Sequence, residues 1–302
     1  MAVTTTLANT PTLRLGFVLI THQKPRQILR LITTLDRMFE GPPIVCHHDF
    51  TQSALPTNTL GQHVSFVRPH HATQWGRFSV VEATLEAMRL MFEGPDPPDW
   101  FVLLSGADYP IKPARTILQD LASSPFDVHL QHERVRYDSN ATWQRKRYDR
   151  YCTLGVDVPG THLRVRLRHP RLTAPFLPFS ETFRCFAGEH WFYANRKATN
   201  YLLEFHRTEF ALARHYRRER RVPSSPDESY YHTVLCNAAH IRVSTDNRRY
   251  IDWSGGGNSP KTLSSHDLPR LRASSAHFAR KFDMDEDPGF LDELDALVQV
   301  EG

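Results

Sequence analysis

The chain has 302 residues, of which 40% are hydrophobic and 23% charged, with 37 Lys and Arg against 33 Asp and Glu. This length allows one large domain or two small ones around a buried core, and the composition is typical of a globular protein. The formal net charge of +4 is too small to indicate nucleic-acid binding.

The first third of the chain alternates strand and helix patterns. Residues 1–13 are rich in Thr and lack periodicity, so we expect a disordered lead-in. Apolar runs predict strands at 13–21, 42–49 and 63–69, and a fourth that runs into a turn across 99–113. Helical spacing predicts helices from Pro25 to Met38 and across 76–92. This alternation favours a mostly parallel α/β sheet flanked by helices.

The middle of the chain, from about 123 to 180, is rich in Arg, Tyr and Pro and only weakly periodic. We expect loops and short strands there that form one wall of a binding cleft. Regular patterns return as a strand and helix at 189–207, a helix over 226–238, a strand with a Gly-rich turn at 248–263 and an amphipathic helix at 289–300. Because no repeat or linker interrupts the pattern, we predict a single domain over 14–302.

Polar side chains follow the predicted strands where each one ends. Ligands of open parallel sheets bind beyond the carboxyl ends of the strands, so these side chains mark a candidate site. They are Thr21 and His22, then His47, His48 and Asp49, then Trp75 and Gly76 before a helix, and finally Ser105 to Asp108.

The sequence indicates neither a metal centre nor disulfides. His47, His48 and Asp49 could in principle ligate a cation, but neighbouring residues of a strand point to opposite sides. The acidic run 283–287 contains D-x-D strings but precedes a Pro-Gly turn, which favours a solvated segment. The four cysteines are scattered without a C-x-x-C pair, so we expect reduced thiols. The N-terminus lacks the features of a signal peptide and no window is long and apolar enough to span a membrane, which predicts a cytoplasmic protein.

A pair of adjacent cations and a single acid each have both a functional and a structural interpretation. Arg280 and Lys281 stand between two phenylalanines, and they either grip a phosphate or form surface ion pairs with the acids that follow. Glu228, at a predicted helix start, is either a general base or an acid favoured there by the helix dipole.

Further candidates lie in two short motifs. Glu189 and His190 lead into an aromatic strand that begins with Trp191, where a histidine is often simply a buried, hydrogen-bonded side chain. Asp108 either binds a ligand or caps the turn before Pro110.

Several segments together resemble one family. The strings "WFVLLSGADYPIK", "GEHWFYANR", "PDESYYHTVL" and "HFARKFD" occur in the order and rough spacing of the core-2/I-branching enzymes, which include peptide O-xylosyltransferases and plant glucuronosyltransferase-like members. "TQWGRFSVVEATLEAM" is similar to the W-G segment of that family. The resemblance covers about Leu15 to Leu294 and implies a GT-A-type, Rossmann-like mixed sheet flanked by helices.

The resemblance also implies a site and a chemistry. It implies a UDP-sugar donor as co-substrate, a glycan, peptide or small-molecule hydroxyl as acceptor, and no metal cofactor. It divides the domain into a nucleotide-binding half, 14–122, and an acceptor-binding and catalytic half, 123–302. The roles it implies are a catalytic base at Glu228, diphosphate-binding cations at Arg280 and Lys281, nucleotide or donor-sugar contacts at Thr21, His22, Asp49, Trp75, Gly76 and Asp108, and an acceptor side at Glu189, His190 and Trp191. Xylosyltransferases carry an acid where this chain has His190.

The expected function is therefore inverting, metal-independent transfer of a sugar, with N-acetylglucosamine as the first choice. The alternatives are transfer of xylose or glucuronic acid on the same fold, or an inactive module that binds a sugar nucleotide or glycan. Nucleic-acid binding through the basic runs 143–150 and 214–221 is disfavoured, because few aromatic residues are interleaved with the charges.

Overall fold

The computed structural model describes residues 13–157, 160, 164–218, 224–257 and 259–299. Apart from Leu13, the predicted lead-in lies outside the described residues.

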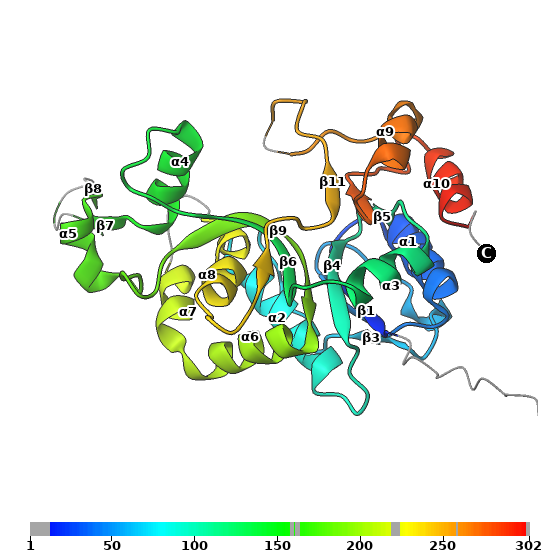
Figure 1. Cartoon of the computed structure of the whole chain (residues 1–302), viewed down its shortest axis with the longest axis horizontal. Helices are drawn as coiled ribbons and strands as arrows, with labels where there is room; N and C mark the ends of the chain where they lie inside the picture. The colour runs from blue at the N-terminus through cyan, green and yellow to red at the C-terminus, as the bar shows by residue number, and fades with distance from the viewer. Residues whose placement is uncertain (1–12, 158–159, 161–163, 219–223, 258, 300–302) are drawn as a thin grey trace, which may run out of the picture.

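A seven-stranded mixed sheet forms the centre of the molecule (Figure 1). Its strand order is β10-β6-β9-β4-β1-β2-β3. In chain order the strands are β1 (Leu15–Thr21), β2 (Ile44–His48), β3 (Val64–Phe66), β4 (Trp100–Ser105), β6 (Val128–Arg134), β9 (Phe186–Asn195) and β10 (Val243–Ser244). The expected α/β class with helices around a mixed sheet is confirmed.

Strand β9 runs antiparallel to both of its neighbours, β4 and β6, whereas the other strand pairs in this sheet are parallel. Val102 of β4 pairs with Tyr193 of β9. The start of β9 therefore lies at the edge where β4 ends, and this register carries Glu189 and His190 to the carboxyl end of the parallel strands.

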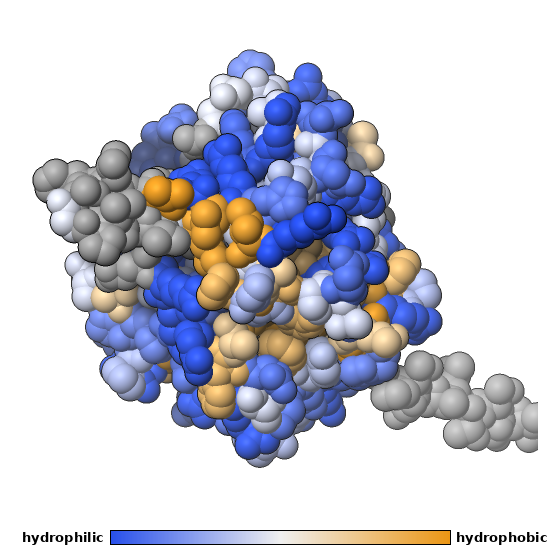
Figure 2. Space-filling model, turned by 90° about the vertical axis from the view of Figure 1, so that its left-hand side faces the viewer, coloured by the Kyte–Doolittle hydropathy of each residue, from blue (hydrophilic) through white to orange (hydrophobic). Residues whose placement is uncertain are grey.

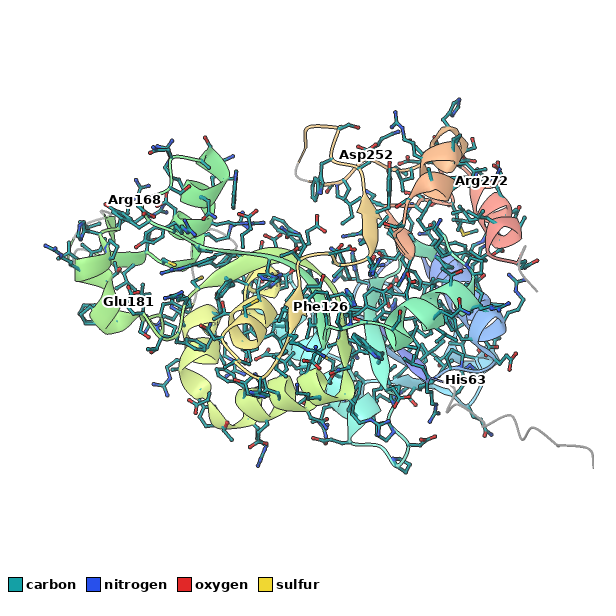
Figure 3. All side chains as sticks on the ribbon, viewed as in Figure 1. His63, Phe126, Arg168, Glu181, Asp252 and Arg272 are labelled. Carbon is teal, nitrogen blue, oxygen red and sulfur yellow. The ribbon has the colours of Figure 1, made fainter. Side chains whose placement is uncertain are left out.

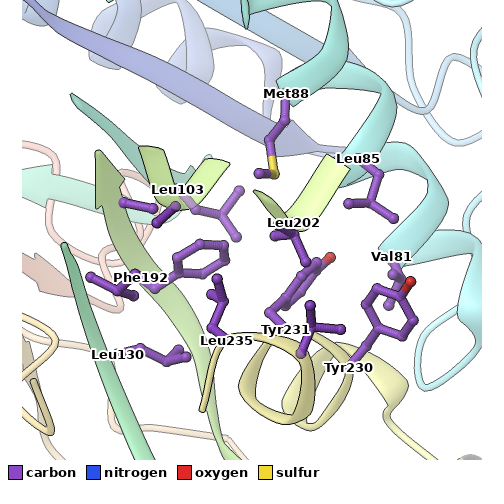
Figure 4. Packing of buried hydrophobic residues seen from close by; sticks show 14 of the residues in the cluster. Val81, Leu85, Met88, Leu103, Leu130, Phe192, Leu202, Tyr230, Tyr231 and Leu235 are labelled. Carbon is purple, nitrogen blue, oxygen red and sulfur yellow. The ribbon is translucent and has the colours of Figure 1, made fainter. Parts of the chain in front are cut away.

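Helices cover both faces of the sheet. The longer ones are α1 (Pro25–Phe39), α2 (Phe78–Phe92), α3 (Ala114–Ala122), α6 (Arg196–Thr208), α7 (Phe210–Arg217), α8 (Tyr230–Cys236) and α10 (Phe290–Gln299). Because side chains alternate along a strand, Leu103 packs with α2, α6 and α8 in one core (Figure 4), while Val102 and Leu104 pack with α1, α3 and α10 in the other. Each predicted amphipathic helix thus buries its apolar face on the sheet.

A smaller sheet stands beside the main one. It has the order β11-β12-β5, with β5 (Asp108–Pro110), β11 (Arg249–Ile251) and β12 (Phe278–Arg280). The remaining elements are the hairpin β7 (Leu154–Asp157) and β8 (Arg164–Leu167), the helices α4 (Thr142–Tyr151), α5 (Pro170–Thr173) and α9 (Leu268–Ala273), and the 3-10 turns η1 (Thr57–Thr59), η2 (Ala174–Phe176), η3 (Pro226–Glu228) and η4 (Ser265–Asp267).

The prediction of loops and short strands over 123–180 was partly wrong. Val128–Arg134 is an inner strand of the main sheet, and Thr142–Tyr151 is a helix. The strand was missed because polar residues such as His129 lie at buried positions and hide the apolar alternation.

The helix predicted over 226–238 is divided. Pro226–Glu228 form a 3-10 turn, Ser229 has non-helical backbone angles, and the α-helix begins at Tyr230. Glu228 consequently lies in a turn before the helix and not within the first turn of a continuous one. Among the described residues no helix combines the length and apolar character needed to cross a bilayer.

Candidate active site

Arg280 lies at the end of β12 with its guanidinium against an aromatic ring. Its Cζ atom is 4.4 Å from the centroid of the Trp191 ring, and its Nε is 3.9 Å from Asp108 Oδ1. The Arg280 side chain is 18% exposed, and its buried Nε has no hydrogen-bond partner among the described residues. Burial lowers the pKa of Arg280, and the nearby Asp108 carboxylate partly opposes that effect. A guanidinium held in this way presents donors to an anion.

The acids after Lys281 are paired with a different cation. Lys24 Nζ bonds the Asp283 carboxylate and lies 3.0 Å from Asp285 Oδ2. Within the described part of the chain neither Arg280 nor Lys281 forms an ion pair with these two acids. The structural interpretation considered for the two cations is therefore not the arrangement observed.

Packing and a glutamine hold the backbone around the two cations. Phe278 is fully buried and Phe282 is 2% exposed. Gln27 Nε2, from the start of α1, donates to the carbonyls of Gly106 at 2.7 Å and Phe282 at 3.1 Å, and Gln27 Oε1 accepts from the Met284 amide at 2.9 Å. One side chain thus joins α1, the loop after β4 and the segment that follows Lys281.

Glu228 and Asp227 form an acidic pair in η3. Arg150 Nη1, from α4, donates to Glu228 Oε2 at 2.9 Å. Burial raises the pKa of Glu228, while Arg150 and Arg147 lower it. Burial and the adjacent Glu228 raise the pKa of Asp227 to about 7. Asp227 Oδ2 lies 3.5 Å from His190 Nδ1, and its buried Oδ1 has no partner among the described residues.

The start of β9 supplies the other polar groups near this pair. Glu189 Oε2 accepts from Asn247 Nδ2 at 2.7 Å, and its Oε1 accepts from the exposed Trp253 Nε1 at 3.3 Å. The His190 ring lies 4.7 Å from the ring of Trp191, which is 9% exposed. Burial lowers the pKa of His190 to about 3, so its ring is neutral at pH 7, and its Nε2 has no partner among the described residues.

The last residues of β1 and β2 contact one another. Thr21 Oγ1 lies 2.9 Å from His48 Nδ1, and His48 Nε2 lies 2.8 Å from the Ser53 carbonyl. His22 is exposed, and its carbonyl accepts from Ser53 Oγ at 2.9 Å. Buried Thr21 therefore helps to hold His48 and the loop after β2 in place, whereas His22 is exposed.

Asp49 is fully buried and its carboxylate binds the protein itself. Oδ1 accepts from the amide and hydroxyl of Thr51, and Oδ2 accepts from Gln52 Nε2 and from the amide and hydroxyl of Thr73. Although burial alone would raise its pKa, these bonds hold the pKa of Asp49 below its ordinary value. The carboxylate shapes the loop, and its role toward uridine stays a prediction.

Asp108 is likewise committed to internal partners. Its Oδ1 accepts from Arg249 Nη1 at 2.8 Å, with both side chains fully buried, and its Oδ2 accepts from the amide of Ser105 at 2.7 Å. The carboxylate ties β4 to β11, which agrees with its interpretation as a structural residue of the turn. Its predicted contact with donor or acceptor stays a prediction.

The loop before α2 meets the loop that carries Glu228. Gly76 has a φ of 71°, a conformation that glycine adopts without strain, and its carbonyl accepts from the amides of Ser224 at 3.0 Å and Ser225 at 3.1 Å. Trp75 beside it is 73% exposed. An exposed aromatic ring therefore stands next to the 3-10 turn that holds the acidic pair.

The three residues considered for cation binding do not form a ligand set. His48 uses both ring nitrogens for protein contacts, Asp49 has both oxygens occupied, and His47 Nε2 lies 2.9 Å from the His71 amide. Over the described ranges no group of three or more His, Cys, Asp and Glu side chains is arranged to hold a metal ion.

The structure thus joins part of the predicted site. A continuous set of contacts runs from Arg280 to Trp191, through the adjacent His190 to Asp227, and so to Glu228. Sequence reasoning missed Asp227, although its place directly before Glu228 was a visible signal. It also missed Arg150, for which no local signal exists, because the partner acid is 78 residues away.

Comparison with known proteins places the chain in a family. Residues 17–272 match the family model described as Core-2/I-Branching enzyme. The chain is 31% identical over 228 residues to the β-glucuronosyltransferase GlcAT14A of Arabidopsis thaliana, an alignment that covers 72% of this chain and 46% of that protein. It is 27% identical over 315 residues to xylosyltransferase 1 of Rattus norvegicus, covering 94% of this chain and 35% of that protein.

The chain spans about half or less of the length of these relatives. The crystal structure of mouse xyloside xylosyltransferase 1 in its apo form aligns with 88% of this chain and 97% of that chain, at a TM-score of 0.41 and 10% identity. Because the family model matches most of its residues, the chain belongs to the Core-2/I-Branching enzyme family.

Proposed function

We propose that this protein is an inverting glycosyltransferase that moves a sugar from a UDP-sugar to an acceptor hydroxyl. The observation that carries the proposal is the contact path from the Arg280 guanidinium, through Trp191 and His190, to the acidic pair at Asp227 and Glu228. This path supports the proposal, because it brings a guanidinium that could stabilise a departing diphosphate and a carboxylate that could act as a base into one neighbourhood.

The proposed step is a single displacement. The Glu228 carboxylate takes the proton of the acceptor hydroxyl while that oxygen bonds to the anomeric carbon of the donor. The bond between that carbon and the diphosphate oxygen breaks, and UDP leaves with the electron pair. Base assistance of this kind contributes about 10²- to 10⁴-fold. Inversion follows, because attack and departure occur on opposite faces of the carbon.

Arg150 fits the needs of such a base. Its hydrogen bond to Glu228 Oε2 orients the carboxylate and favours the ionised form that burial disfavours. The other oxygen, Oε1, is the one that we assign to the acceptor proton.

We further propose that Arg280 and Lys281 stabilise the negative charge on the leaving diphosphate in place of a metal ion. Neither cation is neutralised by Asp283 or Asp285, because those acids pair with Lys24. Fixed cations in a partly buried site stabilise developing charge without reorganisation of solvent.

The donor sugar is the open part of the proposal. N-acetylglucosamine is the donor expected from the sequence. The relatives named glucuronosyltransferase and xylosyltransferase place glucuronic acid and xylose beside it as candidates.

The test is the release of UDP from a panel of UDP-sugars in the presence of EDTA, with the wild type, Glu228→Gln and Lys281→Ala. We expect release from one donor that resists EDTA and falls at least about 100-fold in Glu228→Gln, because the base is lost while the size of the side chain is kept. Lys281→Ala should lose both release and UDP affinity.

Calorimetry with UDP separates the outcomes if an acceptor is strictly required. Wild type and Glu228→Gln should bind UDP alike, and Lys281→Ala should bind it more weakly. Absence of UDP binding by the wild type would refute the diphosphate role. UDP-sugar binding without turnover on any hydroxyl acceptor would favour the inactive binding module, and release that EDTA abolishes would contradict the metal-independent mechanism.

A further inference from the structure

Residues 134–184 are here called the projecting segment, and those that the structure describes, 134–157, 160 and 164–184, extend from the main sheet at the left of Figure 1 and carry α4, β7, β8, α5 and η2. This segment contains eleven Lys and Arg against four Asp and Glu, in a chain that totals 37 against 33. The rest of the chain therefore has 26 against 29. The net positive charge of the protein therefore comes from about a sixth of its length.

The same segment exposes large apolar side chains. Five of those exposed in the described structure belong to it, namely Tyr137 at 47%, Trp143 at 43%, Val165 at 50%, Leu172 at 56% and Phe176 at 61%. Figure 2, which faces this side of the molecule, shows an apolar cluster bordered by strongly hydrophilic residues. Contiguous exposed apolar surface with a polar rim is typical of an interaction site.

The segment is internally packed and is hydrogen-bonded to the loop that leads to Glu228. Tyr148 is 9% exposed, its hydroxyl donates to the Arg168 carbonyl at 3.1 Å, and its ring lies 5.2 Å from that of Tyr137. The Tyr151 hydroxyl donates to the Ser225 carbonyl at 3.0 Å. The exposed side chains therefore stand on a packed segment, whose inner end is held beside Glu228 by the Tyr151 hydrogen bond.

We propose that the projecting segment docks onto an anionic lipid surface. Leu172 and Phe176 would enter the boundary between headgroups and acyl chains, and the exposed Arg166 and Arg171 would contact lipid phosphates. Arginine and large apolar side chains exposed on the same segment suit attachment to the interface of an anionic membrane. Arg168, labelled on this segment in Figure 3, is also exposed, although its guanidinium pairs with the Asp149 carboxylate at 2.9 Å.

A nucleic acid is the weaker match to this surface. Phosphate would satisfy the arginines and the exposed aromatic rings could stack on bases, but the exposed aliphatic side chains Val165 and Leu172 match lipid and not a nucleic acid. The fixed inner end gives docking a consequence, because it would hold the loop that carries Glu228 near the lipid surface. The inference does not depend on transferase activity, so its test can fail or succeed independently of the proposed function.

Flotation of the purified full chain with lipid vesicles tests the proposal. The probes are vesicles of phosphatidylcholine alone and vesicles with roughly 30% phosphatidylglycerol, at low and at about 0.5 M salt, together with a random oligonucleotide. The variants are Leu172→Glu/Phe176→Glu and Arg166→Glu/Arg171→Glu. The control is Leu90→Glu/Arg115→Glu, which makes one apolar-to-Glu and one Arg-to-Glu change at exposed positions on α2 and α3.

We expect the wild type and the control to float with the anionic vesicles at low salt. Neutral vesicles or high salt should reduce binding at least about tenfold, and each variant of the projecting segment should do the same. Unchanged thermal melting would show that these variants are folded. The proposal is overturned if the wild type does not bind anionic vesicles, if it binds neutral vesicles equally, if the variants bind like the control, or if the oligonucleotide binds more tightly than the vesicles.

Discussion

Asp227 links folding to pH, because its pKa differs between the folded and unfolded states. Its pKa is raised to about 7 by burial and by Glu228, and an unfolded aspartate has an ordinary pKa near 3.8. Between these values the folded state holds a proton that the unfolded state releases, so stability falls as pH rises from about 4 to 7. Burial lowers the pKa of His190, which faces Asp227, to about 3. Its ring is therefore neutral in the folded protein across this window while the unfolded histidine binds a proton below about 6.5, which gives an opposite pH dependence that an Asp227 substitution leaves in place.

Asp227→Asn should remove this dependence. We expect Asp227→Asn to gain on the order of 2 kcal/mol of unfolding free energy relative to the wild type between pH 5 and pH 7.5, because only the wild type loses the proton that Asp227 holds. Urea unfolding of both proteins at the two pH values measures this difference, to which the buried histidines contribute equally in both. Equal pH dependence of wild type and variant would show that Asp227 is ionised in the folded protein at pH 5.

Arg249 of β11 and Asp108 of β5 form a buried ion pair. Both side chains are fully buried and the pair is closed at 2.8 Å. Arg249→Met leaves the Asp108 carboxylate buried without its cation, which should cost about 3–5 kcal/mol of unfolding free energy. Urea denaturation should show this loss, while the exposed Arg115→Met serves as control. A loss below about 1 kcal/mol would mean that water or Arg280 compensates.

At the scale of elements, the contact between β6 and β9 positions Glu189 and His190, the predicted acceptor side. The register shifts between Leu130 and His132, opposite Gly188, where a Cβ would lie 1.8 Å from the Gln131 carbonyl oxygen. The Gln131 side chain in turn accepts from the Glu189 amide at 3.0 Å. Only glycine permits this close approach of the two strands.

Gly188→Ala should therefore separate the two strands and displace Glu189. We expect a loss of roughly 2 kcal/mol or more of unfolding free energy, together with weaker donor turnover. Gly289→Ala is the control, because a Cβ there meets nothing within 4 Å. Equal behaviour of the two variants in thermal melting would contradict the close approach.

The pattern of elements could largely be predicted from the sequence, because each core helix and most core strands carry their own apolar period. The strand Val128–Arg134 was missed for a physical reason. His129 is buried within it and lies 2.9 Å from Ser124 Oγ, so tertiary contacts accommodate a polar residue that local pattern assigns to the surface.

At the scale of the whole molecule, both predicted halves contribute strands to one sheet. Strands β1 to β4 come from 14–122, whereas β6, β9 and β10 come from 123–302, and β4 pairs with β9. The division into a nucleotide-binding and an acceptor-binding half stays a functional prediction. The shared sheet joins the two halves into one structural unit, because neither half can cover its strands alone.

Unfolding should accordingly be a single cooperative transition. We expect urea curves followed by tryptophan fluorescence and by far-UV circular dichroism to coincide, because both cores pack on the same strands. Two separated transitions would show that the halves fold as independent units.

The sequence alone determined the fold class, the succession of the main strands and helices, and the motifs that indicate the family. These depend on local periodicity and on short ordered strings, which are readable without knowledge of contacts. Only the tertiary structure decided which charges are neutralised. Asp108 meets Arg249 across 141 residues, and Lys24 meets Asp283 across 259. Such pairs depend on the order of strands in the two sheets, and a local pattern cannot encode that order.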